Sequence, residues 1–172
     1  MTVLFQLLKV GWTPLHAALQ NLASEGLIKT RPKVGSIFAE WDNTQLLEAV
    51  LIRANLETEV VRRLAETKSG LPSLEPVLAI LELAAELDDY ETFFDQDEIF
   101  NAELSHIAGI PIPWKLAKSI KGHIDCQRYS MTSRFPKRSR RVFKEHLRII
   151  EEIRSGSSSS AASAMRGHVN SV

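Results

Sequence analysis

The sequence predicts a mainly α-helical protein, with a small helix-and-hairpin unit over residues 1–41 and an all-helical bundle over residues 42–172. Two observations predict this class. Apolar residues recur at three- and four-residue spacing through most of the chain, which is typical of amphipathic helices. Short β-branched segments flank a turn with Pro and Gly between Leu27 and Glu40, which is typical of a hairpin.

Composition and charge narrow the possible functions. The 172 residues are 44% hydrophobic and 24% charged, as in globular proteins with a sizeable core. Because 21 basic residues balance 21 acidic ones, any nucleic-acid contact must come from a local basic patch. The single cysteine, Cys126, excludes an internal disulfide and a four-cysteine zinc site, and no catalytic set is evident. No apolar run approaches a membrane span, so we expect a cytoplasmic protein that does not enter a membrane.

The first predicted element is a helix that follows Thr13. Thr is a favourable N-cap, and Pro14 fits the first turn, where no backbone donor is needed. Leu15, Leu19 and other apolar residues then recur at helical spacing. Gly26 is a favourable C-terminal stop.

The segment Leu27–Glu40 predicts two short strands joined by a tip at Arg31–Gly35. A helix that leads directly into a hairpin with Lys29, Arg31 and Lys33 near its tip indicates a winged helix. An ordinary solvated cationic turn is the alternative interpretation of the hairpin alone.

The remainder of the chain predicts a series of helices bounded by Gly, Pro and Ser. Ser157–Ser160 is either a low-complexity linker or the opening of a last short helix, since the residues after it favour helix. The expected helices are Asp42–Lys68, Ser73–Asp88, Tyr90–Ala108, one from about Trp114 through Ile120, Ile124 and Met131, and one that follows Pro136 and includes Ile153.

Three of these helices carry polar, metal-capable residues on otherwise apolar faces. Asp97 and Asn101 lie one turn apart, His146 lies among isoleucines, and His168 follows Met165 at helical spacing. Buried polar groups require partners, and a divalent cation would satisfy all of them at once. Hydrogen-bonded core histidines are the competing interpretation, and periodicity alone leaves both open.

Several motifs resemble the GntR family of bacterial transcription regulators, in the FadR-like subfamily with the helical FCD ligand-binding domain. Gly11–Glu40 resembles the end of that family's winged helix-turn-helix, and Arg53–Ala65 resembles its Arg-x-x-x-Glu motif. Asp97-x-x-Phe100-Asn101 is similar to the family's D-x-x-F-H, Glu145-His146 to its E-H, and Gly156 through His168 to its closing motif.

The resemblance implies a partial winged-helix DNA-binding domain at 1–41 and an FCD-like effector-binding and dimerisation domain at 42–172. It implies a divalent metal, zinc before nickel or manganese, beside a pocket for a small organic or sugar acid, with Arg53 as a candidate effector contact. The implied metal ligands are Asp97, Asn101, His146 and His168. The implied DNA-binding residues are Trp12, Thr13, His16, Lys29, Arg31, Lys33 and Gly35.

The sequence departs from the family pattern at some of these positions. Asn101 stands where the family usually has His, and its amide oxygen is a weaker ligand. Trp12 and His16 stand where DNA-contacting Arg is common, and Ser157 replaces an Asp. Only about ten residues precede the first helix, which is shorter than the family's N-terminal region.

The function expected from this resemblance is DNA-binding transcription regulation, as a repressor and homodimer on operator DNA, controlled by the acid effector. A truncated dimer that binds metal and ligand without binding DNA is the first alternative. A metalloenzyme is the second, but no catalytic base can be chosen from the sequence, so we expect no enzyme activity.

Overall fold

The computed structural model describes residues 7–31, 35–39, 43–68, 70–122, 124–126, 128 and 137–171. The chain forms two compact units, Met1–Asn43 and Thr44–Val172, and the sequence analysis had placed this division after residue 41. Within the described residues, none of the helices combines the length and apolar character that crossing a membrane requires.

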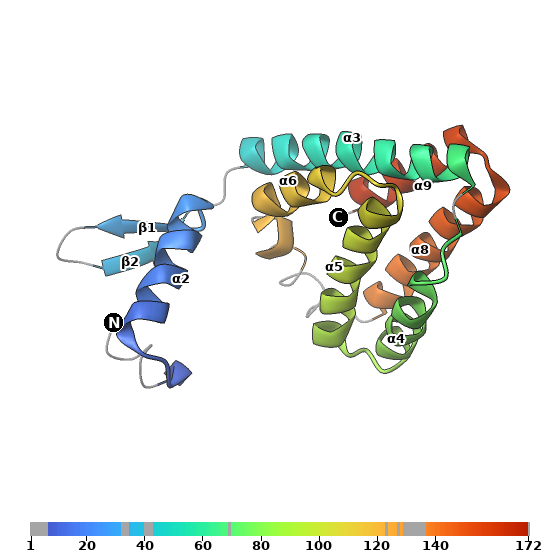
Figure 1. The fold of residues 1–172 in the computed structure, drawn as a ribbon. Helices are drawn as coiled ribbons and strands as arrows, with labels where there is room; N and C mark the ends of the chain where they lie inside the picture. The colour runs from blue at the N-terminus through green and yellow to red at the C-terminus, as the bar shows by residue number, and fades with distance from the viewer. Residues whose placement is uncertain are drawn as a thin grey trace. The chain divides into compact units, whose positions relative to one another are not determined.

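In the first unit, helix α2 spans Trp12–Ser24 (Figure 1). The prediction that Thr13 caps this helix is wrong, because Gly11 occupies the N-cap and makes no side-chain hydrogen bond. Pro14 therefore lies two residues deeper, at the third helical position, still within the turn whose amides lack helical acceptors. The predicted stop is confirmed: Gly26 adopts a φ of 75°, and the amide of Leu27 donates to the carbonyl of Leu22 at 2.9 Å.

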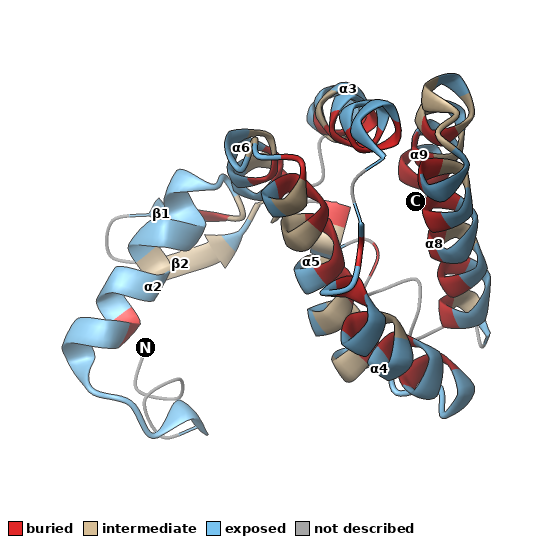
Figure 2. Cartoon of the chain, turned by 45° about the vertical axis from the view of Figure 1, so that its right-hand side comes forward, coloured by how far each residue is buried: buried red, intermediate tan, exposed pale blue. Residues whose placement is uncertain are grey.

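The hairpin consists of β1 (Ile28–Arg31) and β2 (Gly35–Phe38), paired antiparallel. Its register sets Ile28 opposite Phe38 and Arg31 opposite Gly35. Gly35 has a φ of 114°, which a side chain rarely tolerates, so glycine suits the end of the turn. Most of α2 is exposed, as Figure 2 shows in pale blue, and Leu15 and Ile28 supply the buried apolar contacts.

The second unit is helical. Helix α4 (Leu74–Glu86) packs antiparallel to α5 (Tyr90–Ile107), α8 (Arg138–Ser155) packs antiparallel to α9 (Ser158–Asn170), and α4 also packs on α8 (Figure 1). Asp42, where the sequence predicts that the first helix of this unit begins, lies outside the described residues. The helices are α3 (Asn43–Thr67), α4 (Leu74–Glu86), α5 (Tyr90–Ile107), α6 (Ile112–Ile120), α8 (Arg138–Ser155) and α9 (Ser158–Asn170).

The helix expected from Trp114 onward differs from the observed one. Helix α6 begins at Ile112 because Pro113 fits its first turn, and it ends at Ile120, with Lys121 as its C-cap. Ile124 is buried beyond that end, and Met131 lies outside the described residues. The apolar spacing thus continues past a break in the helix that periodicity does not reveal.

The serine-rich segment opens a helix and is not a linker. Ser157 is the N-cap residue of α9, and its hydroxyl donates to the hydroxyl of Ser160 at 2.8 Å. Gly156, with a φ of 78°, ends α8 immediately before it. One tight connection therefore joins α8 to α9 and sets these two helices antiparallel.

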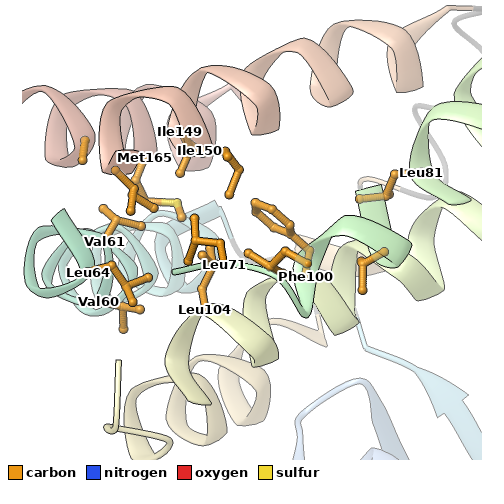
Figure 3. Close-up of a cluster of buried hydrophobic side chains, with 14 of the residues drawn as sticks. Val60, Val61, Leu64, Leu71, Leu81, Phe100, Leu104, Ile149, Ile150 and Met165 are labelled. Carbon is orange, nitrogen blue, oxygen red and sulfur yellow. The ribbon is translucent and has the colours of Figure 1, made fainter. Parts of the chain in front are cut away.

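The core of the second unit lies between α3, α4, α5, α8 and α9. Figure 3 shows its central side chains, including Leu64, Phe100, Ile149 and Met165, all of which are fully buried. The inward faces of α5 and α8 are buried along their length in Figure 2. The polar residues described next share those faces, so they lie inside the core.

Candidate metal centre

Helix α5 positions the first two candidate ligands. Asp89 caps it by accepting a hydrogen bond from the amide of Thr92 at 3.1 Å. Two turns further on, Asp97 is 0% exposed and Asn101 is 3% exposed. The amide nitrogen of Asn101 donates to the backbone carbonyl of Asp97 at 2.9 Å. Its Oδ1 is buried and accepts no hydrogen bond within the described part of the chain.

Helix α8 contributes His146, which is fully buried. Its imidazole is stacked on the ring of Phe100, with centroids 4.3 Å apart, and lies nearly parallel to the ring of Phe93 at 6.2 Å. These aromatic contacts hold the ring so that Nε2 lies 3.0 Å from Oδ1 of Asp97. The two atoms are close without the alignment of a hydrogen bond, which leaves both available to a shared ligand.

Helix α9 contributes His168, which is 3% exposed. Its Nδ1 lies 3.0 Å from Oε2 of Glu145, and the hydroxyl of Ser171 donates to that same oxygen at 3.0 Å. Burial alone would raise the pKa of Glu145, but the hydrogen bond from His168 opposes it, and the pKa lies below its ordinary value. The carboxylate is therefore ionised and accepts the hydrogen bond. His168 therefore carries its proton on Nδ1 and keeps the lone pair of Nε2 for another partner.

Three of the predicted ligands converge. Asp97, His146 and His168 each offer a ligand atom, and these atoms lie within 4.8 Å of one another. Asn101 lies on the same face of α5, and its buried Oδ1 is the candidate for a fourth donor, the second oxygen of the set. Buried polar atoms without hydrogen bonds are costly, and coordination would satisfy Oδ1 of Asn101 and Nε2 of His146 together. The residues present therefore fit a divalent cation.

The charge states of two of these residues suit metal binding. Burial alone would raise the pKa of Asp97, but Arg128 and His146 outweigh it and hold that pKa well below its ordinary value. Burial lowers the pKa of His146, in spite of the opposing carboxylate of Asp97. At neutral pH the site thus presents an anionic carboxylate and a neutral imidazole, the forms that coordinate metals.

Arg53, the predicted effector contact, is also in the interior of the second unit. Its side chain is 1% exposed, and its guanidinium pairs with Glu57 through contacts of 2.7 and 3.2 Å. Its Nη1 is buried and makes no hydrogen bond within the described residues. Nη1 of Arg53 is therefore a buried donor that could still form a hydrogen bond with an acceptor.

Two buried cations were not identified from the sequence. Lys121 pairs with Glu98 and with Asp125, the latter at 3.3 Å, and its ammonium lies 5.1 Å from the ring centroid of Trp114. Arg128 forms an ion pair with Oδ2 of Asp97 at 2.8 Å. Both residues follow α6, where the helical spacing is interrupted, so no periodic signal marked them as inward-facing.

The predicted DNA-binding residues lie in the first unit. Trp12 is 54% exposed, and its ring centroid lies 5.7 Å from that of His16 on the next turn. Thr13 in α2 and Lys29 and Arg31 in β1 are exposed, and Gly35 is partly buried. Lys33 lies outside the described residues.

Comparison with known proteins gives a family match and several relatives. The family model described as FCD domain matches residues 48–171. The HTH-type transcriptional repressor RspR of Escherichia coli (strain K12) is 28% identical over 165 residues, which cover 95% of this chain and 72% of that protein. An HTH-type transcriptional regulator in an unstable DNA locus of Streptomyces ambofaciens is 30% identical over 173 residues, covering 95% and 69%.

Solved structures share the fold. McbR/YncC of E. coli superposes with a TM-score of 0.79 at 20% identity, covering 99% of this chain and 82% of that one. A GntR regulator from Rhodococcus sp. RHA1 gives a TM-score of 0.76 at 14% identity, with the same coverage. The metal-free FCD domain of TM0439 gives 0.62 at 20% identity, covering 77% and 91%. These likenesses confirm the predicted combination of a small two-stranded sheet with a helical bundle.

Proposed function

Because the chain belongs to the FCD-domain branch of the GntR family of transcription regulators, we propose that it represses transcription from operator DNA until a small organic or sugar acid binds. We propose further that it acts as a cytoplasmic homodimer. The observation that carries the effector side of the proposal is the convergence of Asp97, His146 and His168 from three helices. RspR, a relative, is named a repressor, which favours repression over activation.

In this proposal a divalent cation, zinc in the first place, is held by Asp97, Asn101, His146 and His168. Mixed imidazole and oxygen donors suit zinc, and they also suit nickel or manganese. When bound, the cation supplies a Lewis acid that attracts a carboxylate. Glu145 contributes by fixing the tautomer of His168, and Phe100 by fixing the ring of His146.

The acid effector would also contact Arg53. The unused Nη1 of Arg53 is a charged donor, and such donors form strong hydrogen bonds with carboxylates. Arg53 acts electrostatically on Lys121, and Asp97 does too, so the predicted effector contact and the metal ligands belong to one connected group of buried charges. An acid bound there would favour one arrangement of the protein over another.

On the DNA side, α2 would enter the major groove with Trp12, Thr13 and His16 in its first two turns, and the hairpin would contact the backbone. Lys29 and Arg31 are exposed on β1 and would neutralise phosphates.

Fluorescence anisotropy with the DNA upstream of the protein's own gene tests DNA binding. We expect binding that weakens between two salt concentrations and exceeds binding to a scrambled duplex. Lys29→Ala should weaken binding to both duplexes and reduce the salt slope by about 1, while Lys115→Ala, an exposed lysine of the second unit, should change neither. Equal affinity for the two duplexes would favour the alternative, a metal- and ligand-binding dimer that does not bind DNA.

Zinc content after gel filtration in acetate buffer tests the metal site. Wild-type protein should retain zinc, and His146→Ala and His168→Ala should each lose it. His106→Ala is the control, because His106 is exposed at the end of α5. Retention of wild-type zinc content by both ligand variants would refute the assignment.

A further inference from the structure

Arg128 occupies an unusual place for a cation, in contact with a residue that the proposed metal requires. Its side chain is 7% exposed, and Asp97, its partner at 2.8 Å, is 0% exposed. The guanidinium also lies 5.7 Å from the ring centroid of Phe94, so an aromatic face bounds it on another side. Because water scarcely reaches the pair, the charges act on one another with little screening.

Asp97 has two oxygens with different neighbours. Oδ2 faces the guanidinium of Arg128, and Oδ1 faces Nε2 of His146, which is itself a proposed ligand. One carboxylate carries one negative charge, and here it already balances one positive charge. A divalent cation bound to this carboxylate would therefore share the carboxylate with Arg128, and the positive charge of the guanidinium would repel the cation.

We propose that Arg128 is a built-in competitor of the metal, which keeps metal affinity low until an anion arrives to balance the additional positive charge. This inference rests on the proposed function and deepens it, because it makes binding of the metal and of the acid effector mutually dependent. Asp97, Arg128 and a divalent cation together carry an excess of two positive charges. A carboxylate that reaches this group reduces the excess and stabilises the loaded state.

Two further residues of the described part of the chain, Asp125 and Tyr90, also act electrostatically on Arg128. Asp125 already forms an ion pair with Lys121 at 3.3 Å. Burial alone would lower the pKa of Arg128, yet Asp97 raises it above its ordinary value, so the guanidinium stays charged throughout the accessible pH range.

The test is a zinc titration against a chromophoric chelator, first with zinc alone and then with acetate as a simple carboxylate. Arg128→Met should bind zinc alone about tenfold or more tightly than wild type, because a neighbouring positive charge is gone. Arg128→Lys keeps the charge and should bind as weakly as wild type. Acetate should tighten zinc binding by wild type and by Arg128→Lys, and should tighten binding by Arg128→Met less.

One control and one additional variant separate this effect from a general loss of packing. Arg63→Met removes a guanidinium that donates to the carbonyl of Ala108 at 2.9 Å, outside the proposed centre, and should leave zinc affinity unchanged. Arg128→Gln is a second neutral variant that retains a polar end, and it serves if the methionine variant does not fold.

The outcomes distinguish this inference from the proposed function. If wild type binds zinc and both neutral variants bind it with the same or lower affinity, the competitor role of Arg128 is overturned and the metal centre stands. If no variant and no wild-type protein binds zinc, the metal centre and the competitor role both fail. Tight binding by the neutral variants and weak binding by wild type is the result that we expect.

Discussion

Individual residues of the second unit decide what the buried site can bind. Asn101 illustrates this, because its amide places an oxygen where a nitrogen ligand would be the stronger partner for zinc. The same amide donates to the backbone of Asp97 at 2.9 Å, which orients Oδ1 away from that bond. Asn101, in place of the His that the family pattern usually has, thus gives the candidate site an oxygen donor instead of a nitrogen donor.

Exchange of this one ligand should change metal preference. Asn101→His should raise zinc affinity about tenfold or more, since imidazole replaces a neutral amide oxygen in a set of borderline-soft ligands. Asn101→Ala, which removes the donor, should lower it. Competition titrations with zinc and manganese measure both effects, and a histidine variant that binds zinc no better than wild type would show that Oδ1 does not coordinate.

At the scale of the elements, the helix ends fix where the functional side chains lie. The connection at Gly156 sets α9 against α8, and this pairing brings His168 to His146, with ring centroids 4.8 Å apart. The cap at Asp89 fixes where α5 begins, and therefore which of its residues face inward. Local chemistry at these ends thus positions a site assembled from distant parts of the chain.

Two glycines next to or within α9 should respond in opposite ways to alanine. Gly156 has a φ of 78°, and an added Cβ would lie 3.0 Å from Cε of Lys68, so Gly156→Ala should reduce the free energy of unfolding by about 1 to 2 kcal/mol. Gly167 lies in helical backbone with no atom within 4 Å of an added Cβ, so Gly167→Ala should increase it by up to about 1 kcal/mol. Urea denaturation measures both, and equal effects would contradict the assigned backbone conformations.

The N-cap of α5 should produce a defined pH dependence. Hydrogen bonds from Thr92 lower the pKa of Asp89, so its ionised form stabilises the folded state. That contribution is present above the unfolded pKa of about 3.9 and is lost as the pH falls through the lower folded value. Asp89→Ala should therefore have a lower Tm than wild type from pH 7 down to about 4, with a narrowing gap below that.

The matched control is Asp95→Ala, an exposed aspartate further along the same helix. Its Tm difference from wild type should not narrow over the same acid range. Thermal melts by circular dichroism provide the measurement, and a gap for Asp89→Ala that persists unchanged to pH 3 would exclude the cap as its cause.

At the scale of the whole molecule, the two compact units perform different parts of the proposed function. The candidate metal ligands all belong to Thr44–Val172, and the candidate DNA contacts all belong to Met1–Asn43. Stability gained from metal should therefore arise in the second unit, because a ligand stabilises only the structure that binds it.

Calorimetry of the intact chain tests this division. Zinc at 100 times its Kd should stabilise the unfolding transition of the second unit by about 2.7 kcal/mol, and a chelator should remove that gain. Hydrogen exchange then locates the gain: amides of α5, α8 and α9 should become better protected, and amides of α2 should not. Equal protection of α2 would show that the units respond as one.

Much of this arrangement could be predicted from periodicity. Asp97, Asn101, His146 and His168 share spacing with apolar neighbours, and all four are buried as that spacing requires. The convergence of Asp97, His146 and His168 could not be predicted in this way, because the pattern within one helix states which residues face inward and not which helices meet. The family resemblance supplied that information.

The buried cations lay beyond this kind of prediction. Lys121 and Arg128 are charged and lie after the end of α6, where neither helical spacing nor residue type indicates burial. Their burial depends on carboxylates from other parts of the chain, Asp97 and Glu98 of α5 among them, together with Asp125. Such compensation is a tertiary property that no local pattern reveals.

The ammonium of Lys121 beside Trp114 has an optical consequence. Trp114 is 8% exposed and lies 5.1 Å from that charge, whereas Trp12 is 54% exposed. A fixed positive charge close to a shielded indole shifts the energy of its excited state, so the emission of Trp114 depends on where the ammonium sits. An acid that draws Lys121 away from the ring would change the blue-shifted part of the fluorescence, and the protein would report occupancy of its own pocket without an attached dye.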